Sequence, residues 1–313
     1  MKTVAIVNPM ASNGRAGEMW PYMAETLQAH YPQLQTRMTE YAGHGADLTR
    51  GALEEGAEQI LVVGGDGSTN EALCGFVDDQ GRNRFPEAVL AIIAAGTGGD
   101  FQRQFGKLKA NRQVVQIAKA PVRQVDYGIA HYTASDGRSA VRPFLNLASA
   151  GLSGDVAARV NDADKSMGPT ATYIRGSLAG ILGYRNQQVE IAYDDGPGRR
   201  IDLTLCAVGN GQYFGGGMWI CPQAQIDDGL FDVVEVSGMS RRRLLPTLAK
   251  VFRGRHLRVA GVECSRAESV SLRPINERTE LRLEVDGEQA GRLPARFEIA
   301  AAALRLRICT SGS

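Results

Sequence analysis

The sequence lacks the cysteine pairs, the long apolar runs and the charge excess by which several classes of protein are recognised. Its five cysteines are scattered, and none stands in a CxxC pair. This spacing argues against a disulfide framework or a thiolate zinc site and fits a reducing cytoplasm. Lysine plus arginine (35) nearly balances aspartate plus glutamate (34), so the overall charge gives no attraction to nucleic acid.

Membrane spans and secretion signals are missing as well. The longest apolar run, 88–95, is far shorter than the roughly 18 residues that a membrane-spanning helix needs. The apolar stretch after Met1 ends at Asn8 and Pro9, which is too early for a signal peptide. We therefore expect a soluble, cytoplasmic protein.

Two familiar kinds of ligand motif are also absent. No segment matches GxxxxGK[S/T], which excludes a P-loop NTPase, and a GxGxxG motif fails because Asn70 occupies its last position. The histidines show no metal-ligand spacing, so we expect them on the surface or in packing roles. They are His30, His44, His131 and His256.

Glycine, in contrast, is abundant, with 37 of the 313 residues against a usual share of about 7%. Glycine lets the backbone approach a ligand closely or adopt a positive φ. Three glycine-containing loops, at 8–17, 64–68 and 96–100, each follow a β-branched run and precede a helical pattern. Alternating strands and helices predict a parallel sheet covered on both faces, in which such loops line one crevice that binds ligands.

After about residue 125 the pattern changes to short alternating strands separated by Asp-Gly turn dipeptides. We therefore expect two domains: an α/β domain with a doubly wound, mostly parallel sheet over 1–125, and a β-rich antiparallel sandwich over 126–296. Helices are expected at about 170–182 and 240–252. The terminal segment 297–313 has a strand pattern that would let it pack back on the first domain.

The second loop, 64–68, reads GGDGS at the start of a predicted helix. Unpaired N–H groups and the helix dipole make such a turn a site for a phosphate group. Asp66 would place a carboxylate in the same turn, which indicates Mg²⁺ or a hydrogen-bonded hydroxyl between the two anions. The alternative to a phosphate site, for any one of the three loops, is that the loop is only a tight connection between a strand and a helix.

Residues 62–71, VVGGDGSTNE, closely resemble the signature of the diacylglycerol kinase catalytic-domain family, which includes bacterial lipid kinases and sphingosine and ceramide kinases. NAD kinases, which are more distant, share the GGDG loop. The resemblance continues in order along nearly the whole chain, at 8–16, 96–106, 215–230 and 286–288. It implies a two-domain kinase with an α/β nucleotide domain, a β-rich lipid domain and a cleft between them.

Carried over by position, the resemblance implies site residues in both domains. Nucleotide contacts are implied for Asn8, Thr39, Gly65, Asp66, Gly67, Ser68, Thr69, Asn70, Glu71 and Thr97. A structural Mg²⁺ is implied at the Asp228 side chain and the backbone carbonyls of Gln225 and Leu230, and Glu288 is implied as the proton acceptor.

Three positions depart from the family pattern. Ser12 stands where glycine is common, and Ser68 stands where threonine is common. Gly99 replaces the usual asparagine before Asp100, so the hydrogen bonds of that side-chain amide are missing and nucleotide placement is expected to loosen.

The acidic turns have structural alternatives. A carboxylate two residues past Asp286 can accept the proton of an alcohol, but Asp-Gly is also a common hairpin turn, which would leave Glu288 on the surface. Asp286 is the alternative base, and Asp66 is the alternative organiser of Mg²⁺-ATP. The acids before Gly229 suit Mg²⁺ or Ca²⁺, and there too a simple hairpin turn is the alternative.

A basic amphipathic helix is predicted at 240–258, where seven Arg or Lys residues occur without an acid. Such a helix lies on an anionic membrane surface, or it packs its apolar face on the core and leaves a solvated cationic face.

These observations predict an ATP-dependent kinase that uses Mg²⁺ to phosphorylate a hydroxyl of a lipid such as diacylglycerol or a sphingoid base. Its partners would be ATP and a lipid met at the inner face of the membrane, with no nucleic acid. An NAD kinase-like enzyme, or a non-catalytic lipid- or nucleotide-binding module of the same fold, is the alternative. The acceptor lipid stays open, and an uncovered strand edge would allow a homodimer.

Overall fold

A computed structural model describes residues 1–96, 99–106, 108–154, 156, 180, 183–276 and 278–311. The chain divides into two compact units. Unit 1 comprises Met1–Val125 with Ala302–Ser313, and unit 2 comprises Asp126–Ala301. The helix expected at 170–182 lies almost entirely outside the described residues.

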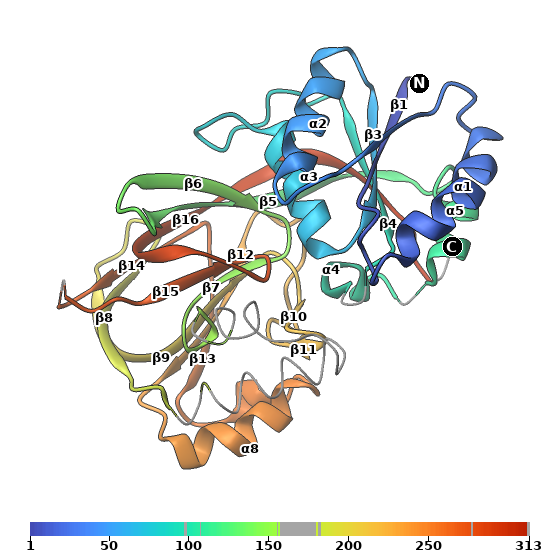
Figure 1. Cartoon of the computed structure of the whole chain (residues 1–313). Helices are drawn as coiled ribbons and strands as arrows, with labels where there is room; N and C mark the ends of the chain where they lie inside the picture. Colours follow the sequence, from blue (N-terminus) through green and yellow to red (C-terminus); the bar gives the residue numbers. More distant parts are fainter. Residues whose placement is uncertain are drawn as a thin grey trace. The chain divides into compact units, whose positions relative to one another are not determined.

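Unit 1 is built on a parallel sheet with the order β16-β4-β3-β1-β2 (Figure 1). Its own strands are β1 (Thr3–Val7), β2 (Gln35–Met38), β3 (Gln59–Gly64) and β4 (Val89–Ala94). The end of β16 (Glu288–Ile308) adds a parallel strand beside β4. β1 and β3 are buried along their whole lengths, because a parallel sheet with helices on both faces has no solvent-exposed face.

Helices cover both faces of this sheet, α1 and α5 on one side and α2 and α3 on the other (Figure 1). The helices are α1 (Arg15–Gln28), α2 (His44–Glu54), α3 (Asp66–Phe76), the short α4 (Asp100–Arg103) and α5 (Ala110–Gln116). On α1, Trp20, Met23 and Leu27 recur at helical spacing and pack on alternate residues of β1 and β3.

Unit 2 is antiparallel throughout its described strand pairs. Neighbouring strands follow the order β9-β7-β15-β16-β14-β8, and β8 pairs again with β9, so the strands close into a ring. The strands are β5 (Val122–Ala134), β6 (Ser139–Phe144), β7 (Leu147–Gly151), β8 (Gln187–Tyr193), β9 (Arg199–Gly209), β12 (Phe231–Ser237), β13 (Val262–Ala267), β14 (Ser269–Pro274) and β15 (Arg282–Val285), with a small hairpin of β10 (Tyr213–Phe214) and β11 (Met218–Trp219). The predicted fold class, an α/β domain followed by a β-rich antiparallel domain, is confirmed.

Three of the Asp-Gly dipeptides form hairpin turns as predicted. They join β5 to β6, β8 to β9 and β15 to β16. The fourth, at Asp228 and Gly229, precedes β12 but does not join two paired strands. A hairpin turn is therefore the wrong explanation for the acids before Gly229.

Unit 2 has two apolar cores, one on each face of the sheet formed by β7, β9 and β12. Alternate residues of these strands, including Ala148, Cys206 and Val233, point into the ring of strands. The other alternate set packs against α8 (Arg241–Val251) and the short helix η2 (His256–Arg258). No helix among the described residues is long and apolar enough to span a membrane.

Candidate functional site

The loops after β3 and β4 approach one another so closely that only glycine fits. A Cβ atom on Gly96 would lie 2.5 Å from the Cα atom of Gly65. Gly96 donates its N–H to the carbonyl of Gly64 at 3.0 Å, and so does Ala95 at 2.8 Å. Because backbone stands on both sides of this contact, a side chain there would force the two loops apart.

The loop after β1 joins this cluster through side chains. Asn8 Nδ2 donates to the hydroxyl of Ser68 at 3.1 Å, and the Ser12 hydroxyl donates to the Ala95 carbonyl at 2.7 Å. Thr39, the residue after β2, donates its N–H to the carbonyl of Val7 at 2.9 Å. The prediction that the three glycine-containing loops meet at one edge of the sheet is confirmed, while Thr97 lies outside the described residues.

Asp66 uses its carboxylate differently from our expectation. Its Oδ2 accepts the N–H of Asp100 at 2.9 Å, and its Oδ1 accepts the N–H of Phe101 at 3.2 Å. Burial raises the pKa of Asp66, and these N–H groups act in the opposite direction. In this structure the carboxylate is therefore a cap that ties the first turn of α4 to the loop of α3.

Gly99, the residue before α4, has φ 59 and ψ 43 and so lies in the left-handed region. Glycine and asparagine are the residues that tolerate this conformation best. Glycine in place of the family's asparagine therefore keeps the backbone geometry. Only the hydrogen bonds of the asparagine side-chain amide are lost.

The residues that follow in α3 turn their side chains inward. Glu71 accepts the N–H of Gly43 at 2.8 Å and of Gly45 at 3.0 Å, which ties the start of α2 to α3. The Thr69 hydroxyl donates to the carbonyl of Gly65 at 3.2 Å, and Asn70 is buried. These side chains hold the loop in shape, whereas Gly67 and Ser68 stay partly exposed.

In unit 2, Asp286 is a buried structural carboxylate. Its Oδ2 accepts the N–H of Leu145, and its Oδ1 accepts the N–H groups of Asn146 and Leu147, each at 3.0 Å. Asp286 itself has a left-handed φ of 47. A carboxylate bonded to three backbone N–H groups stabilises the turn, and its oxygens are already engaged.

Glu288, two residues later, is accessible. Its side chain is 47% exposed, and its Oε2 accepts a hydrogen bond at 2.8 Å from Arg142, whose own side chain is only 20% exposed. Arg142 lies on β6. The turn thus provides one buried carboxylate that is fully engaged and one exposed carboxylate that an arginine holds in place.

The loop before β12 gathers acids that the sequence alone did not connect. Gly229 donates its N–H to the Asp126 carboxylate at 2.7 Å, and Asp228 accepts the N–H of Leu230 at 3.2 Å. Arg266 forms an ion pair with Asp228 and lies 3.7 Å from Asp232.

The loop and the start of β12 together carry an excess of negative charge. Both oxygens of Asp232 are buried without a hydrogen-bond partner, and burial raises the pKa of Asp232 to about 6. Two carboxylates therefore share one guanidinium. No three His, Cys, Asp or Glu side chains form a metal-binding group in the described part of the chain. The predicted set of one carboxylate, Asp228, with the carbonyls of Gln225 and Leu230 still offers the hard oxygen donors that Mg²⁺ prefers.

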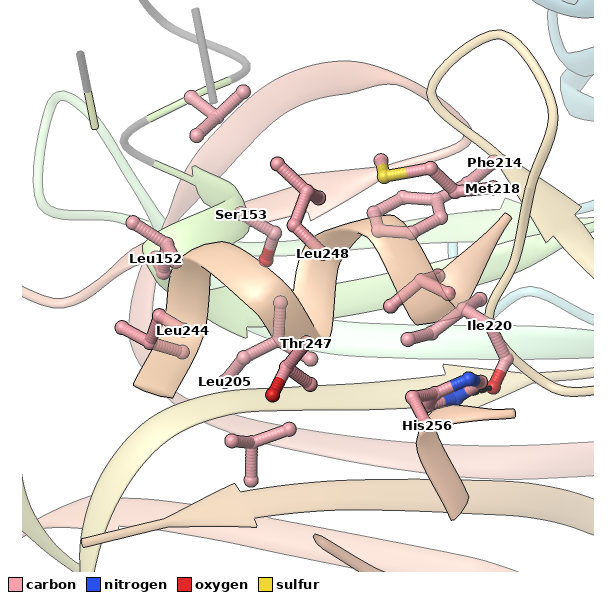
Figure 2. A pocket seen from close by; sticks show the side chains of 13 residues that line it. Leu152, Ser153, Leu205, Phe214, Met218, Ile220, Leu244, Thr247, Leu248 and His256 are labelled. Carbon is pink, nitrogen blue, oxygen red and sulfur yellow. Dashed lines mark hydrogen bonds between the residues drawn. The ribbon is translucent and has the colours of Figure 1, made fainter. Parts of the chain in front are cut away.

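An apolar cavity of about 80 Å³ lies in unit 2 beneath α8 (Figure 2). This volume is well below the range of about 300–1,000 Å³ that is usual for ligand pockets. Its lining consists of Leu152, Ser153, Val156, Leu205, Phe214, Met218, Ile220, Val236, Leu244, Thr247, Leu248, Val251 and His256. Sequence analysis missed it, because isolated aliphatic residues from several elements carry no signal until the fold brings them together.

Comparison with known proteins places both units in one family. Residues 2–130 match the diacylglycerol kinase catalytic domain, and residues 146–308 match the YegS C-terminal NAD kinase beta sandwich-like domain. A diacylglycerol kinase of Mycobacterium tuberculosis H37Rv is 28% identical, over 97% of this chain and 94% of the relative. A probable YegS-like lipid kinase of Chromohalobacter salexigens is 31% identical, over 69% of this chain and 65% of the relative.

Solved structures show the same fold. A putative diacylglycerol kinase from Bacillus anthracis str. Sterne has a TM-score of 0.76 at 24% identity, covering 98% of this chain and 96% of that one. Yeast NADH kinase has a TM-score of 0.53 at 12% identity, covering 99% of this chain and 84% of that one. The predicted family is confirmed: the chain belongs to the diacylglycerol kinase catalytic-domain family, whose members are phosphotransferases that act on a lipid alcohol.

Proposed function

We propose that this chain transfers the terminal phosphate of ATP to a hydroxyl of a lipid such as diacylglycerol or a sphingoid base, with Mg²⁺. The observation that carries the proposal is the pair of glycines, Gly65 and Gly96, whose contact leaves no room for a side chain. Bare backbone beside the start of α3 is the arrangement by which helix N-termini bind phosphate groups.

In unit 1 we assign the phosphates of ATP to the backbone N–H groups of Gly65, Gly67 and Ser68. Asp66 and Glu71 act indirectly, because their carboxylates cap α4 and α2 and so hold the loop in one shape. Asn8 contributes by fixing the Ser68 hydroxyl. Thr39 and Thr97 stay assigned to nucleotide binding by resemblance to the family.

In unit 2 we assign the proton acceptor to Glu288. The lipid hydroxyl gives its proton to this carboxylate, its oxygen forms a bond to the terminal phosphorus of ATP, and ADP leaves. Asp286 is less suited, because three backbone N–H groups already occupy its oxygens. Arg142 holds the Glu288 carboxylate in one orientation.

Mg²⁺ would be held by Asp228 and by the backbone carbonyls of Gln225 and Leu230. When bound, the ion supplies positive charge to a loop that has two carboxylates for one guanidinium. The shortage of positive charge supports this assignment, because the buried Asp232 has no hydrogen-bond partner and shares the single guanidinium of Arg266 with Asp228.

The test is transfer of labelled phosphate from ATP to micelles of extracted lipids, with and without Mg²⁺, and identification of the product by mass spectrometry. Glu288→Gln should lower turnover by about 10²–10⁴-fold, the usual contribution of a general base. The matched control is Glu280→Gln, which changes an exposed glutamate paired with Arg292 and should leave turnover within about twofold.

Three results would contradict the proposal or a part of it. ATP binding without transfer to any lipid would favour a non-catalytic binding module. Transfer to NAD in place of a lipid would favour an NAD kinase-like enzyme, to which the fold alone points. Turnover that survives Glu288→Gln would remove this residue from the mechanism.

A further inference from the structure

Unit 2 also carries a polar cleft of about 520 Å³ on the neighbouring strands β6, β5, β16, β14 and β8 (Figure 1). Its volume is within the range of about 300–1,000 Å³ that is usual for ligand pockets. Asp286, Glu288 and Arg142 are not among the described residues that line it. The cleft is therefore distinct from the residues that we assign to proton transfer.

The polar side chains of the cleft point away from the ring of strands. On β14, Leu272 points into the apolar core, so Ser271 and Arg273 on either side of it point outward. On β16, Arg296 points outward between two residues of the same core. The cleft therefore lies on the outer face of the ring, where polar side chains of adjacent strands stand next to one another.

Two arginines on adjacent strands give the cleft positive charge. Ser271 pairs with Arg296 in the register of β14 and β16, so Arg273, two residues further along β14, is a diagonal neighbour of Arg296. Diagonal neighbours lie about 7–8 Å apart, so two long guanidinium side chains can converge on one anion. Arg273 is exposed and has no ion pair in the part of the chain that the structure describes.

The acids on this face do not cancel its positive charge. Glu190 stands opposite Arg273 on one side and opposite Arg200 of β9 on the other, so one carboxylate faces two guanidinium groups. Glu298 forms an ion pair with Arg296 at 2.7 Å. Three arginines face two glutamates, and this excess of positive charge favours an anionic ligand.

Hydroxyl groups line the remainder of the cleft. Thr133 and Ser139 stand opposite each other on β5 and β6, and Ser271 stands opposite Arg296. None of these three hydroxyls has a hydrogen-bond partner among the residues that the structure describes. Because a hydroxyl both donates and accepts, all three are available to the hydroxyl groups of a ligand.

We propose that this cleft binds the phosphate ester of a polyol, with the phosphate between Arg273 and Arg296 and the polyol against the three hydroxyls. Guanidinium groups match phosphate oxygens with paired hydrogen bonds. An uncharged polyol would leave the arginines unmatched, and inorganic phosphate would leave the hydroxyls without a partner. Two sources carry this chemistry: a soluble polyol phosphate and the headgroup of an anionic phospholipid. The inference goes beyond the proposed function, because it requires neither ATP nor phosphate transfer.

sn-Glycerol 3-phosphate is the soluble probe, and inorganic phosphate and glycerol are its two halves. Calorimetric titration of the whole chain measures the affinity for each. The ester should bind about tenfold more tightly than inorganic phosphate, because hydrogen bonds to the hydroxyls add to the same phosphate contacts. Equal affinities for the ester and inorganic phosphate would overturn the inference.

Arg273→Gln removes one guanidinium without breaking an ion pair, so it should weaken ester binding about tenfold or more. Thr133→Val keeps the shape of the side chain and should narrow the difference between the ester and inorganic phosphate. The matched control is Arg292→Gln, on β16 but outside the lining, which removes the same charge from a pair with Glu280 and should stay within about twofold. Equal losses in Arg273→Gln and Arg292→Gln would overturn the inference.

The glycine loops of unit 1 are proposed to bind phosphate groups as well, so a further variant tells the two sites apart. Gly96→Ala, which places a methyl group against Gly65, should bind the ester as the wild type does. Ester binding that is lost in Gly96→Ala but survives Arg273→Gln would assign the ester to those loops and overturn the inference. Ester binding by a chain that phosphorylates no lipid would overturn the kinase proposal alone.

Vesicles of phosphatidylglycerol in phosphatidylcholine distinguish the two sources. The exposed cations at α8 would bind them too, so the comparison uses a chain with Arg242→Gln, Lys250→Gln and Arg253→Gln. If the ligand is a headgroup, adding Arg273→Gln weakens vesicle binding further, and sn-glycerol 3-phosphate competes with the vesicles. If the ligand is a soluble ester, Arg273→Gln weakens ester binding alone. Binding of both probes that survives Arg273→Gln would overturn the inference.

Discussion

Asp286 and Glu288 stand two residues apart, and their surroundings give their carboxylates opposite characters. Asp286 is buried and accepts three backbone N–H groups from one segment of chain, 145–147. Glu288 is half exposed and touches a single arginine, Arg142. At the scale of the residue, burial and bonding partners separate a carboxylate that stabilises the fold from one that stays accessible to solvent.

Asp286→Asn should therefore destabilise the protein. An amide keeps one acceptor but turns a donor toward the N–H groups, so the free energy of unfolding should fall by about 2–4 kcal/mol. Urea denaturation measures this change. Glu288→Gln, the matched control, should stay within about 0.5 kcal/mol of the wild type, and an Asp286→Asn variant of equal stability would refute the structural role of this carboxylate.

His256 should make stability depend on pH. Because burial lowers its pKa from 6.5, the unfolded chain takes up a proton on this ring at a higher pH than the folded chain does. The stability that the neutral ring contributes is present above about pH 6.5 and is lost as the pH falls.

Urea denaturation between about pH 7 and pH 5 tests this, a window that brackets the usual titration range of histidine. His256→Gln should lose less stability over that range than the wild type. His30→Gln, at an exposed position, should follow the wild-type curve. Parallel curves for the wild type and His256→Gln would contradict the expectation.

At the scale of the element, the loops of unit 1 depend on carboxylates that cap the starts of helices. Asp66 caps α4, and Glu71 caps the start of α2. The side-chain contacts between Asn8 and Ser68 and between Ser12 and Ala95 complete the cluster. The geometry of the loops is therefore determined by hydrogen bonds between the starts of the helices and the neighbouring loops.

Gly96→Ala tests this loop cluster. The added methyl group would lie 2.5 Å from the Gly65 Cα atom and should force the loops after β3 and β4 apart. We expect ATP to bind at least about tenfold more weakly and the free energy of unfolding to fall by about 1–3 kcal/mol. Calorimetric titration and urea denaturation measure the two effects.

Gly51→Ala is the matched control for Gly96→Ala. Gly51 lies inside α2, where a Cβ atom would meet only Arg37 Nη1 at an ordinary 3.5 Å. It should bind ATP normally and gain about 0.5–1 kcal/mol, since alanine is the better helix former. Wild-type affinity for ATP in Gly96→Ala would show that the loops do not bind the nucleotide.

At the scale of the whole molecule, a nearly neutral chain concentrates unpaired positive charge at α8 and the residues after it. Arg242, Lys250, Arg253, Arg255 and Arg258 are exposed, and none has an acidic partner among the residues that the structure describes. The apolar side of α8 packs on the core of unit 2. The helix therefore combines both interpretations of the sequence: a core-packed face and an exposed cationic face.

Neutralising Arg242, Lys250 and Arg253 with glutamine should weaken binding to vesicles of anionic phospholipid. Each charge near such a surface contributes about 1 kcal/mol, so three together should change the affinity roughly 100-fold. Vesicle sedimentation at low and at high salt measures this loss, which salt should diminish.

The control removes the same charge elsewhere. Glutamine at Arg82, Arg138 and Arg292 breaks ion pairs with acidic neighbours and should leave vesicle binding within about twofold. Equal losses of vesicle binding in both triple variants would show that net charge, and not the position of the charges on α8, determines binding. No loss in the α8 variant would exclude this helix as the membrane contact.

Strands β1, β3 and β4 of unit 1 were predictable, because a strand buried on both faces is a continuous apolar run rich in β-branched residues. Helix α2 was missed, since Gly45 and Gly51 interrupt its pattern. Strands β6 and β13 were missed too, because short half-buried strands carry weak periodicity. The caps formed by Asp66 and Glu71 join segments more than 20 residues apart in the chain, and no local pattern shows such partners.

The sequence by itself determined the family, the two fold classes and the acidic and glycine residues of the candidate site, because motif residues and hydrophobic periodicity are local properties. Only the tertiary structure decided which carboxylates are already bonded, as for Asp286, and which remain exposed, as for Glu288. It alone also revealed the cavity with the unpartnered Nδ1 of His256. The physical reason is that bonding and burial depend on neighbours that the fold brings together from distant parts of the chain.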